Sequence, residues 1–191
     1  YRLARGYDRF SHQASALGHV VIADAFHRRL PGIDWERALT LMSKDLGREY
    51  GEAFFQDGVV HPLTHTLDLA YGCFCTAVIA TEIGDTTVAA QMLEYASQWK
   101  NAFDKNGVLR DSTYYEGSKY NYSFRLLHDM ASRISLAGGD TAFVDLLDIF
   151  FGYSADSVPA PGVSPCRAEM AEGELLGRFE GFNNCLLYTS P

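Results

Sequence analysis

Side chains that could bind and transform a sugar are most concentrated between Asp111 and Tyr122. Tyr115 and Tyr120 offer flat apolar rings, and Glu116 offers a carboxyl group beside a glycine, where the backbone allows a ligand to approach closely. Sugar rings present apolar faces to aromatic planes and a rim of hydroxyls to carboxylates and amides. The segment is therefore a candidate carbohydrate site. The alternative is a solvated loop whose carboxylates cap neighbouring helices.

A second polar group is formed by His61, His65 and Asp68. The two histidines have the i, i+4 spacing that can hold zinc. However, Pro62 places His61 at or before the first helical turn, and no glutamate follows it in the pattern of a zinc protease. Zinc is therefore not favoured. The alternative is that His65 and Asp68 are polar groups at a helix start that satisfy backbone donors.

A third candidate is the adjacent pair His128 and Asp129, which we expect on one helix with their side chains pointing in different directions. No serine or cysteine has the surroundings of a nucleophile elbow, and no glycine-rich phosphate loop is present. A nucleophilic triad and a phosphate-binding loop are therefore not indicated.

The elements that must position these groups are helices. Apolar residues recur with helical period, while alternation of period two is missing at any length, so the chain is predicted to be all-α. The first helix should carry Ala14, Leu17 and Val21 on its buried face, and residues 51–61 should form a loop. The predicted helices span residues 11–30, 34–46, 62–83, 85–103, 120–134 and 140–150.

Short Gly-Asp connections at 84–86 and 139–141 should join antiparallel neighbours, which gives three helical hairpins. Hairpins of this kind stack either in an open solenoid or in a closed α/α toroid. The repeats lack a fixed period, and the loops between hairpins are long and polar, so the toroid is favoured. After Gly152 the chain is rich in proline and reads as a long loop.

The amino-acid composition argues against several classes of binding partner. The 191 residues have 16 Lys and Arg against 24 Asp and Glu, a formal charge of -8 without a basic stripe, which argues against nucleic acid. The longest apolar runs are a few residues, so no membrane span is expected. The cysteines lack metal or disulfide patterns, and Cys73 and Cys75 are expected to be small buried side chains.

Several segments, taken in order, resemble the catalytic domain of glycoside hydrolase family 92. They include Tyr114 to Gly117, Tyr122 to Asp129, Ala137 to Gly139 and Phe179 to Asn184. Upstream likenesses are Gly18 to Ala25, Gly32 to Leu39 and His65 to Tyr71. Members of this family are calcium-dependent, inverting exo-α-mannosidases that combine a β-sandwich with a six-hairpin α/α toroid. The resemblance implies a mannose-containing glycan as substrate and export to the periplasm or exterior.

The resemblance also implies roles for single residues. Glu116 would be the general acid that protonates the leaving oxygen, with a carboxylate base about 6.5 to 9.5 Å away across the sugar. The family's base lies on a Gly-Asn-Asp-Asp type motif that this sequence does not contain. Asn183 and Asn184 would supply amide oxygens to calcium, and Glu180 would match a leaving-group subsite or be a surface carboxylate. Substrate contacts are expected from Tyr115, Tyr120, His65, Asp68, His128 and Asp129.

The sequence also differs from the family pattern at several positions. Tyr120 stands where a tryptophan is usual, Gly72 and Cys73 replace acidic residues, and Cys185 replaces the glutamate of the calcium motif. Residues 1–184 are accordingly expected to be part of an α/α-toroid catalytic domain, and residues 185–191 a non-native tail. Two alternatives stay open: a non-catalytic helical-repeat binding protein, and a toroid enzyme acting on another carbohydrate.

Overall fold

The structure is a computed structural model, and it describes residues 15–48, 50–110, 122–125 and 128–151. The chain divides into two compact units, Tyr1–Ala102 and Phe103–Pro191, which we describe separately. Among the described residues, helices dominate both units, as predicted. Within the described ranges there is no strand, and the one β-type pairing is an isolated antiparallel bridge between Phe103 and Leu109.

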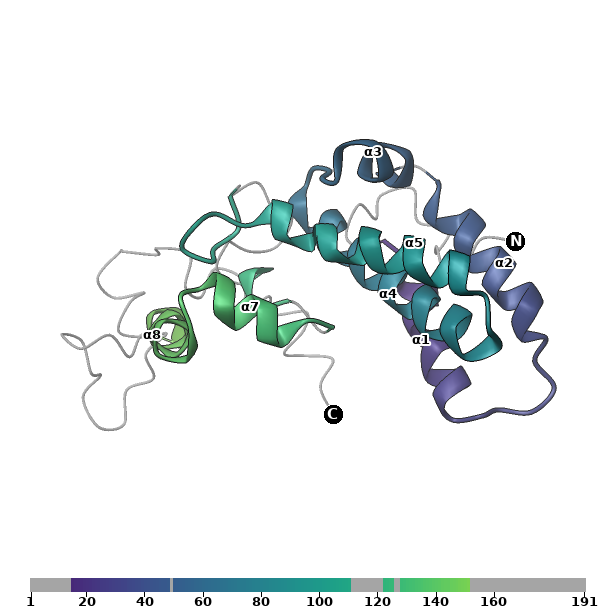
Figure 1. The fold of residues 1–191 in the computed structure, drawn as a ribbon. Helices are drawn as coiled ribbons and strands as arrows, with labels where there is room; N and C mark the ends of the chain where they lie inside the picture. The colour runs from purple at the N-terminus through teal and green to yellow at the C-terminus, as the bar shows by residue number, and fades with distance from the viewer. Residues whose placement is uncertain (1–14, 49, 111–121, 126–127, 152–191) are drawn as a thin grey trace, which may run out of the picture. The chain divides into compact units, whose positions relative to one another are not determined.

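The first unit is built around one central helix (Figure 1). Helix α4 packs against α1, α2, α3, α5 and the 3-10 helix η1. Fifteen of its residues are buried, including His65, Asp68 and Gly72. The elements of the unit are α1 (Leu17–His27), α2 (Trp35–Leu46), α3 (Tyr50–Asp57), α4 (Leu63–Ile83), α5 (Thr86–Ser97) and η1 (Gln98–Ala102).

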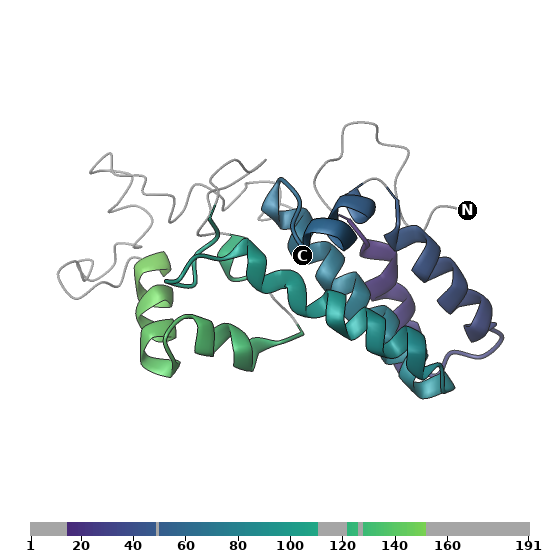
Figure 2. The same ribbon diagram turned by 45° about the horizontal axis from the view of Figure 1, so that its top comes forward.

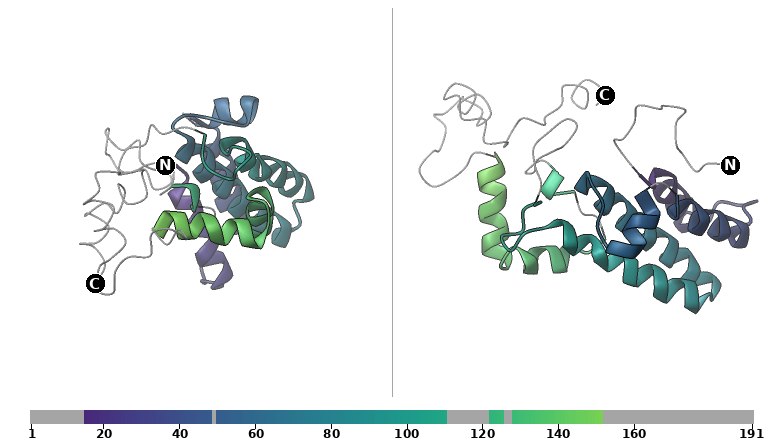
Figure 3. Two further views of the ribbon diagram at one scale, coloured as in Figure 1. Left: turned by 90° about the vertical axis from the view of Figure 1, so that its left-hand side faces the viewer. Right: turned by 90° about the horizontal axis from the view of Figure 1, so that it is seen from above.

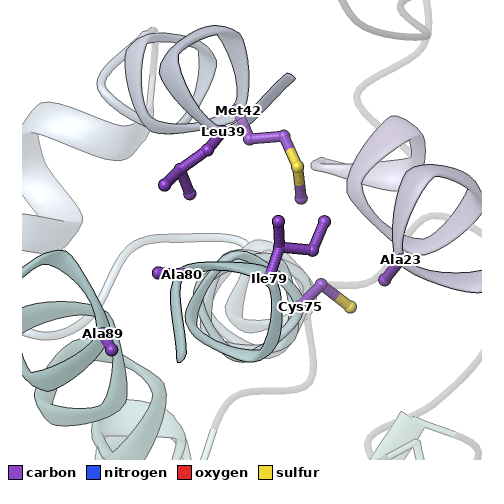
Figure 4. Close-up of a cluster of buried hydrophobic side chains, with 7 residues drawn as sticks. All are labelled: Ala23, Leu39, Met42, Cys75, Ile79, Ala80 and Ala89. Atoms are coloured by element: carbon purple, nitrogen blue, oxygen red, sulfur yellow. The ribbon is translucent and has the colours of Figure 1, made fainter. Parts of the chain in front are cut away.

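Small and medium apolar side chains fill the space around α4 (Figure 4). Met42 of α2 points towards Ile79 of α4, and both are fully buried. Ala23 of α1 and Ala89 of α5 approach the same helix from other sides. Because these contacts use alanines, the helices can lie close together, and α4 is enclosed on several sides rather than along one stripe.

Three predicted helix boundaries with local causes, at Asp34, Gly84 and Asp85, are confirmed. The helix predicted over 85–103 is divided instead, because α5 ends at Ser97 and η1 follows to Ala102. Asp34 and Asp85 are N-caps whose Oδ1 atoms accept hydrogen bonds from Arg37 N and Val88 N, each at 3.0 Å. Gly84 ends α4 with a φ of 88°, a conformation that glycine adopts without strain. The hairpin predicted at 84–86 is formed, and α4 and α5 run side by side in opposite directions (Figures 1 and 2).

The second unit contains α7 (Met130–Leu136) and α8 (Asp140–Phe151). These helices were expected to be antiparallel neighbours, but they cross steeply, so that where α8 is seen end-on α7 is seen from the side (Figures 1 and 3). The connection contains Gly138 and Gly139, with φ angles of 103° and 100°. Two successive residues of this kind turn the chain differently from the single glycine that joins α4 to α5.

Three further predictions about helices are wrong. Residues 51–61 were expected to be a loop, but α3 occupies Tyr50–Asp57 and buries Phe54. Leu17 and Val21 of α1 are exposed, and the buried face of this helix is formed by His19 and Ala23 instead. Of the helix predicted over 120–134, Tyr122 and Ser123 are helical, but the described residues 124, 125, 128 and 129 are not. Helix α7 begins at Met130, and its Ala131 is exposed.

The expectation about cysteines is confirmed for the two that the structure describes. Cys73 and Cys75 are free and buried, and burial raises the pKa of the Cys75 thiol to about 11. Burial also raises the pKa of the Cys73 thiol, so both sulfur atoms are neutral thiols at neutral pH. Cys166 and Cys185 lie outside the described residues.

The sequence predicts no membrane span, and α4 is the helix against which this expectation must be compared. By length and composition alone it could cross a membrane, although no single apolar run in it is long. Its most apolar window is 67% buried inside the protein. Packing in the centre of the first unit therefore accounts for its apolar character.

Candidate active site

Two predicted site residues, His65 and Asp68, lie together at the start of α4 and are almost fully buried, at 1% and 7% exposure. Both contact Ser15, which precedes α1. The backbone N–H of Ser15 donates to Asp68 Oδ2 at 2.9 Å, and the Ser15 hydroxyl lies 2.7 Å from Nδ1 of His65. These side chains therefore join the beginning of α4 to a segment some fifty residues earlier. The alternative interpretation is confirmed in part, because Asp68 does satisfy a backbone donor, although this donor belongs to Ser15 and not to α4.

Tyr50, the first residue of α3, covers the same histidine. Its ring is stacked on the imidazole of His65, with centroids 4.3 Å apart and planes inclined by 16°. Next to it, Thr66 Oγ1 both donates to Val60 O and accepts from Val60 N, at 2.9 Å each. The connection between α3 and α4 is thus fixed against α4, and the ring of His65 has a defined orientation.

The histidines at 61 and 65 do not form a zinc site in this arrangement. Pro62 is the N-cap of α4, so His61 lies outside the helix and is exposed while His65 is buried. More generally, nowhere in the described ranges do three or more His, Cys, Asp or Glu side chains approach closely enough to hold a metal ion.

The pair His128 and Asp129 is placed differently from the prediction. The two residues are not on a helix: Asp129 is the N-cap of α7, and its Oδ1 accepts a hydrogen bond from Ser132 N at 3.3 Å. His128 precedes the cap, and both residues are half-buried. The carboxylate of Asp129 therefore has a structural task at the start of α7.

Arg133 is the most unusual polar residue of the second unit, and the sequence analysis missed it. It is 1% exposed, and its guanidinium donates to two backbone carbonyls, Gly107 O and Ser123 O. Burial lowers its pKa to about 10, opposed by the nearby charge of Asp104, so it stays protonated at neutral pH. A charged residue among the apolar positions of α7 was the available signal.

All of the remaining predicted site residues lie outside the described part of the chain. These are Tyr115, Glu116, Tyr120, Glu180, Asn183 and Asn184. The expected calcium ligands, Asn183 and Asn184, are likewise among these residues.

A separate surface cavity of about 310 Å³ opens at the turn between α1 and α2. Phe26 and Trp35 form an edge-to-face pair beside it, and Glu82 near the end of α4 completes its wall. His65 lies at the opposite end of α4. None of the predicted site residues lines this cavity.

Two solved structures have a fold similar to that of this chain. An α-mannosidase of family GH92 from Bacteroides thetaiotaomicron matches 81% of this chain, with a TM-score of 0.66 and 20% identity. A family GH92 inverting mannosidase from the same organism, strain VPI-5482, matches 92% of the chain, with a TM-score of 0.65 and 20% identity. The matches cover 24% and 27% of those proteins, so this chain spans about a quarter of their length. The helices are part of an α/α toroid, as predicted.

The sequence itself defines the family. The model of the glycosyl hydrolase family 92 catalytic domain matches residues 8–175. The chain therefore belongs to glycosyl hydrolase family 92. No curated protein sequence matches it significantly.

Proposed function

We propose that this chain is the part of an exo-α-mannosidase that supplies the general acid, and that the enzyme removes terminal α-mannose from glycans with inversion. The observation that carries the proposal is the family match over residues 8–175, which spans Glu116 in the sequence. The proteins of similar fold are described as an α-mannosidase and an inverting mannosidase, which supports the same reaction.

In the proposed reaction Glu116 gives its proton to the glycosidic oxygen as the bond to the anomeric carbon breaks. A carboxylate base activates water on the opposite face of the sugar, which yields the inverted product. Glu116 must be protonated when substrate binds, so its surroundings in the working enzyme should raise its pKa.

Calcium belongs to the proposal through Asn183 and Asn184, whose amide oxygens are ligands of the kind that calcium accepts. When bound, the ion would orient sugar hydroxyls. The proposed location is the periplasm or the exterior of a glycan-degrading bacterium, on the family resemblance alone.

The role of Glu116 is tested by Glu116→Gln in an active enzyme that contains this chain. For a mannobiose, whose leaving group needs a proton, we expect kcat to fall by about 10²- to 10⁴-fold. For 2,4-dinitrophenyl α-mannoside, whose leaving group departs as an anion, the fall should be far smaller. Glu52→Gln, an exposed change on α3, is the matched control and should leave both rates unchanged.

Proton NMR of the first product then tests inversion, since an α-mannoside should release β-mannose before mutarotation. Equal losses on both substrates for Glu116→Gln, or unchanged rates, would show that Glu116 is not the acid. Release of α-mannose would contradict an inverting mechanism.

A further inference from the structure

The surface cavity of about 310 Å³ belongs entirely to the first unit of the chain. Its wall is formed by the last turn of α1, the connection to α2, the first residue of α2 and the last turn of α4. Its volume lies at the lower end of the range for small-molecule sites, about 300–1,000 Å³, which suits a single small ring. Six residues line it: Phe26, His27, Arg29, Leu30, Trp35 and Glu82.

The aromatic part of this wall is fixed by packing. Phe26 packs against the buried cluster that contains Ile79, and its ring meets that of Trp35 at 87°, with centroids 4.9 Å apart. Asp34 caps α2 and so fixes the backbone that carries Trp35. Trp35 is half-buried, and part of its indole is open to the cavity. A ligand would therefore meet a preformed aromatic surface.

Two charged side chains in the wall have no partner among the residues that the structure describes. The guanidinium of Arg29 and the carboxylate of Glu82 form no hydrogen bond or ion pair there. The neighbouring Arg28, by contrast, does not line the cavity and is paired with Asp24 at 2.7 Å. The cavity thus has hydrogen-bond donors on one residue and acceptors on another, both open to a ligand.

The backbone of Arg29 favours a different residue. Its φ is 53°, in the left-handed region, just after the end of α1. Leu30 N donates to Ala25 O at 3.1 Å and Arg29 N to Phe26 O at 2.9 Å, a pair of bonds that commonly ends a helix at a glycine. Gly84 has a left-handed conformation of this kind at the end of α4, whereas a residue with a Cβ is strained in it. Helix termination therefore does not explain the arginine, and its side chain in the cavity wall does.

We propose that this cavity binds one pyranose ring of a neutral glycan, with an apolar face of the ring against Trp35 and its hydroxyls on Arg29 and Glu82. A sugar hydroxyl both donates and accepts, so neighbouring hydroxyls can pair with a guanidinium and with a carboxylate. An anion would be repelled by Glu82, and an apolar ligand would remove water from both charges without replacing it. The proposal goes beyond the proposed function and does not depend on hydrolysis, since the cavity lies at the end of α4 opposite to His65.

The two tryptophans of the chain provide the measurement. Trp35 lines the cavity and Trp99 is fully buried, and each gives one indole N–H signal in a ¹⁵N–¹H correlation spectrum. We expect methyl α-mannopyranoside, added to the 191-residue chain, to shift the Trp35 signal with a Kd on the order of 1–10 mM. The Trp99 signal should stay in place. Trp35→Phe removes one signal and so assigns both.

Substitutions separate a binding role from a structural one. Arg29→Gly removes the guanidinium but supplies the residue that the backbone favours, so the urea midpoint should rise while the Kd increases about 10-fold. Glu82→Gln removes the carboxylate and should increase the Kd about 3- to 10-fold. Arg28→Met and Glu52→Gln are the matched controls outside the cavity and should leave the Kd unchanged.

The results decide for or against the sugar site. Weaker binding by an Arg29→Gly chain of raised stability would support it, because damage to the fold could not be the cause. The inference would be wrong if methyl α-mannopyranoside shifted neither signal or both equally, or if Arg29→Gly and Glu82→Gln left the Kd unchanged. If inorganic phosphate shifts Trp35 instead, and binds more tightly to Glu82→Gln, the cavity is an anion site. None of these results depends on Glu116→Gln, so the proposed function and this inference fail separately.

Discussion

At the scale of single residues, His19 is a buried base whose protonation opposes folding. Its side chain is fully buried, and its Nε2 lies 3.0 Å from Met42 O, an arrangement that suits a neutral imidazole donating to the carbonyl. Nδ1 has no hydrogen-bond partner among the described residues. Burial lowers the pKa of His19 from its ordinary value of 6.5, with smaller opposing effects from Met42 and Asp45.

The sign of the resulting pH dependence follows from these two states. As the pH falls below about 6.5, the unfolded chain takes up a proton at His19 before the folded chain does, so the free energy of unfolding decreases. The contribution is complete above that pH, and it is lost towards the lower pKa of the folded state. We expect His19→Gln to flatten this dependence, by up to about 1.4 kcal/mol per pH unit. Urea unfolding of both proteins between pH 7.5 and pH 5 measures it, and parallel curves would contradict it.

The residues that could be predicted from the sequence are those whose partners are close in the chain. Asp34 and Asp85 were expected as caps because a cap bonds to a backbone group only three residues ahead. Ser15 and His65 meet across fifty positions, and Arg133 meets Gly107 across 26. Such pairs depend on how the helices pack, and helical periodicity does not contain that information.

At the scale of elements, Gly72 lets α4 approach its neighbours. A Cβ at this position would lie 2.6 Å from the Cβ of Ala16 and 3.0 Å from Cδ2 of Leu46. A side chain larger than hydrogen at this position would therefore overlap both neighbours.

Gly72→Ala should therefore lower the free energy of unfolding by about 1–2 kcal/mol, because overpacking outweighs the gain in helix propensity. Gly47→Ala is the matched control: the nearest atom to its added Cβ is Lys44 O at 3.7 Å, so the change should stay within about 0.5 kcal/mol. Urea unfolding at constant pH compares them. Greater stability of Gly72→Ala would show that α4 moves aside at little cost.

Helix faces and short helices were harder to predict than helix ends. The sequence analysis gave α1 the face of Leu17 and Val21, but both are exposed, since α4 contacts the side with His19 and Ala23. Residues 51–61 were expected to form a loop, but Gly51 belongs to α3, where an added Cβ would lie 1.6 Å from Leu46 O. That glycine permits the close contact between the end of α2 and α3 rather than breaking a helix.

At the scale of the whole molecule, the all-α class followed from the missing period-two alternation, and the toroid from the irregular spacing of the hairpins. The steep crossing of α7 and α8 did not follow, since two Gly-Asp connections of similar sequence produce different angles. The family could be predicted because its motifs occur in the same order along most of the chain. Those motifs include Glu116, the acid of the proposed reaction, and the sequence lacks the Gly-Asn-Asp-Asp type motif that the resemblance implies for the base.

Inverting hydrolysis needs two carboxyl groups. One protonates the leaving oxygen, and the other deprotonates the water that attacks the anomeric carbon, so an acid without a base is not sufficient. We therefore expect this chain by itself to hydrolyse a mannobiose no faster than buffer, with or without added calcium. Far-ultraviolet circular dichroism should show that it is nevertheless helical. The measurement is mannose release at high protein concentration, with the Glu116→Gln chain as control. Calcium-dependent release that Glu116→Gln abolishes would mean that a carboxylate within these 191 residues already acts as the base.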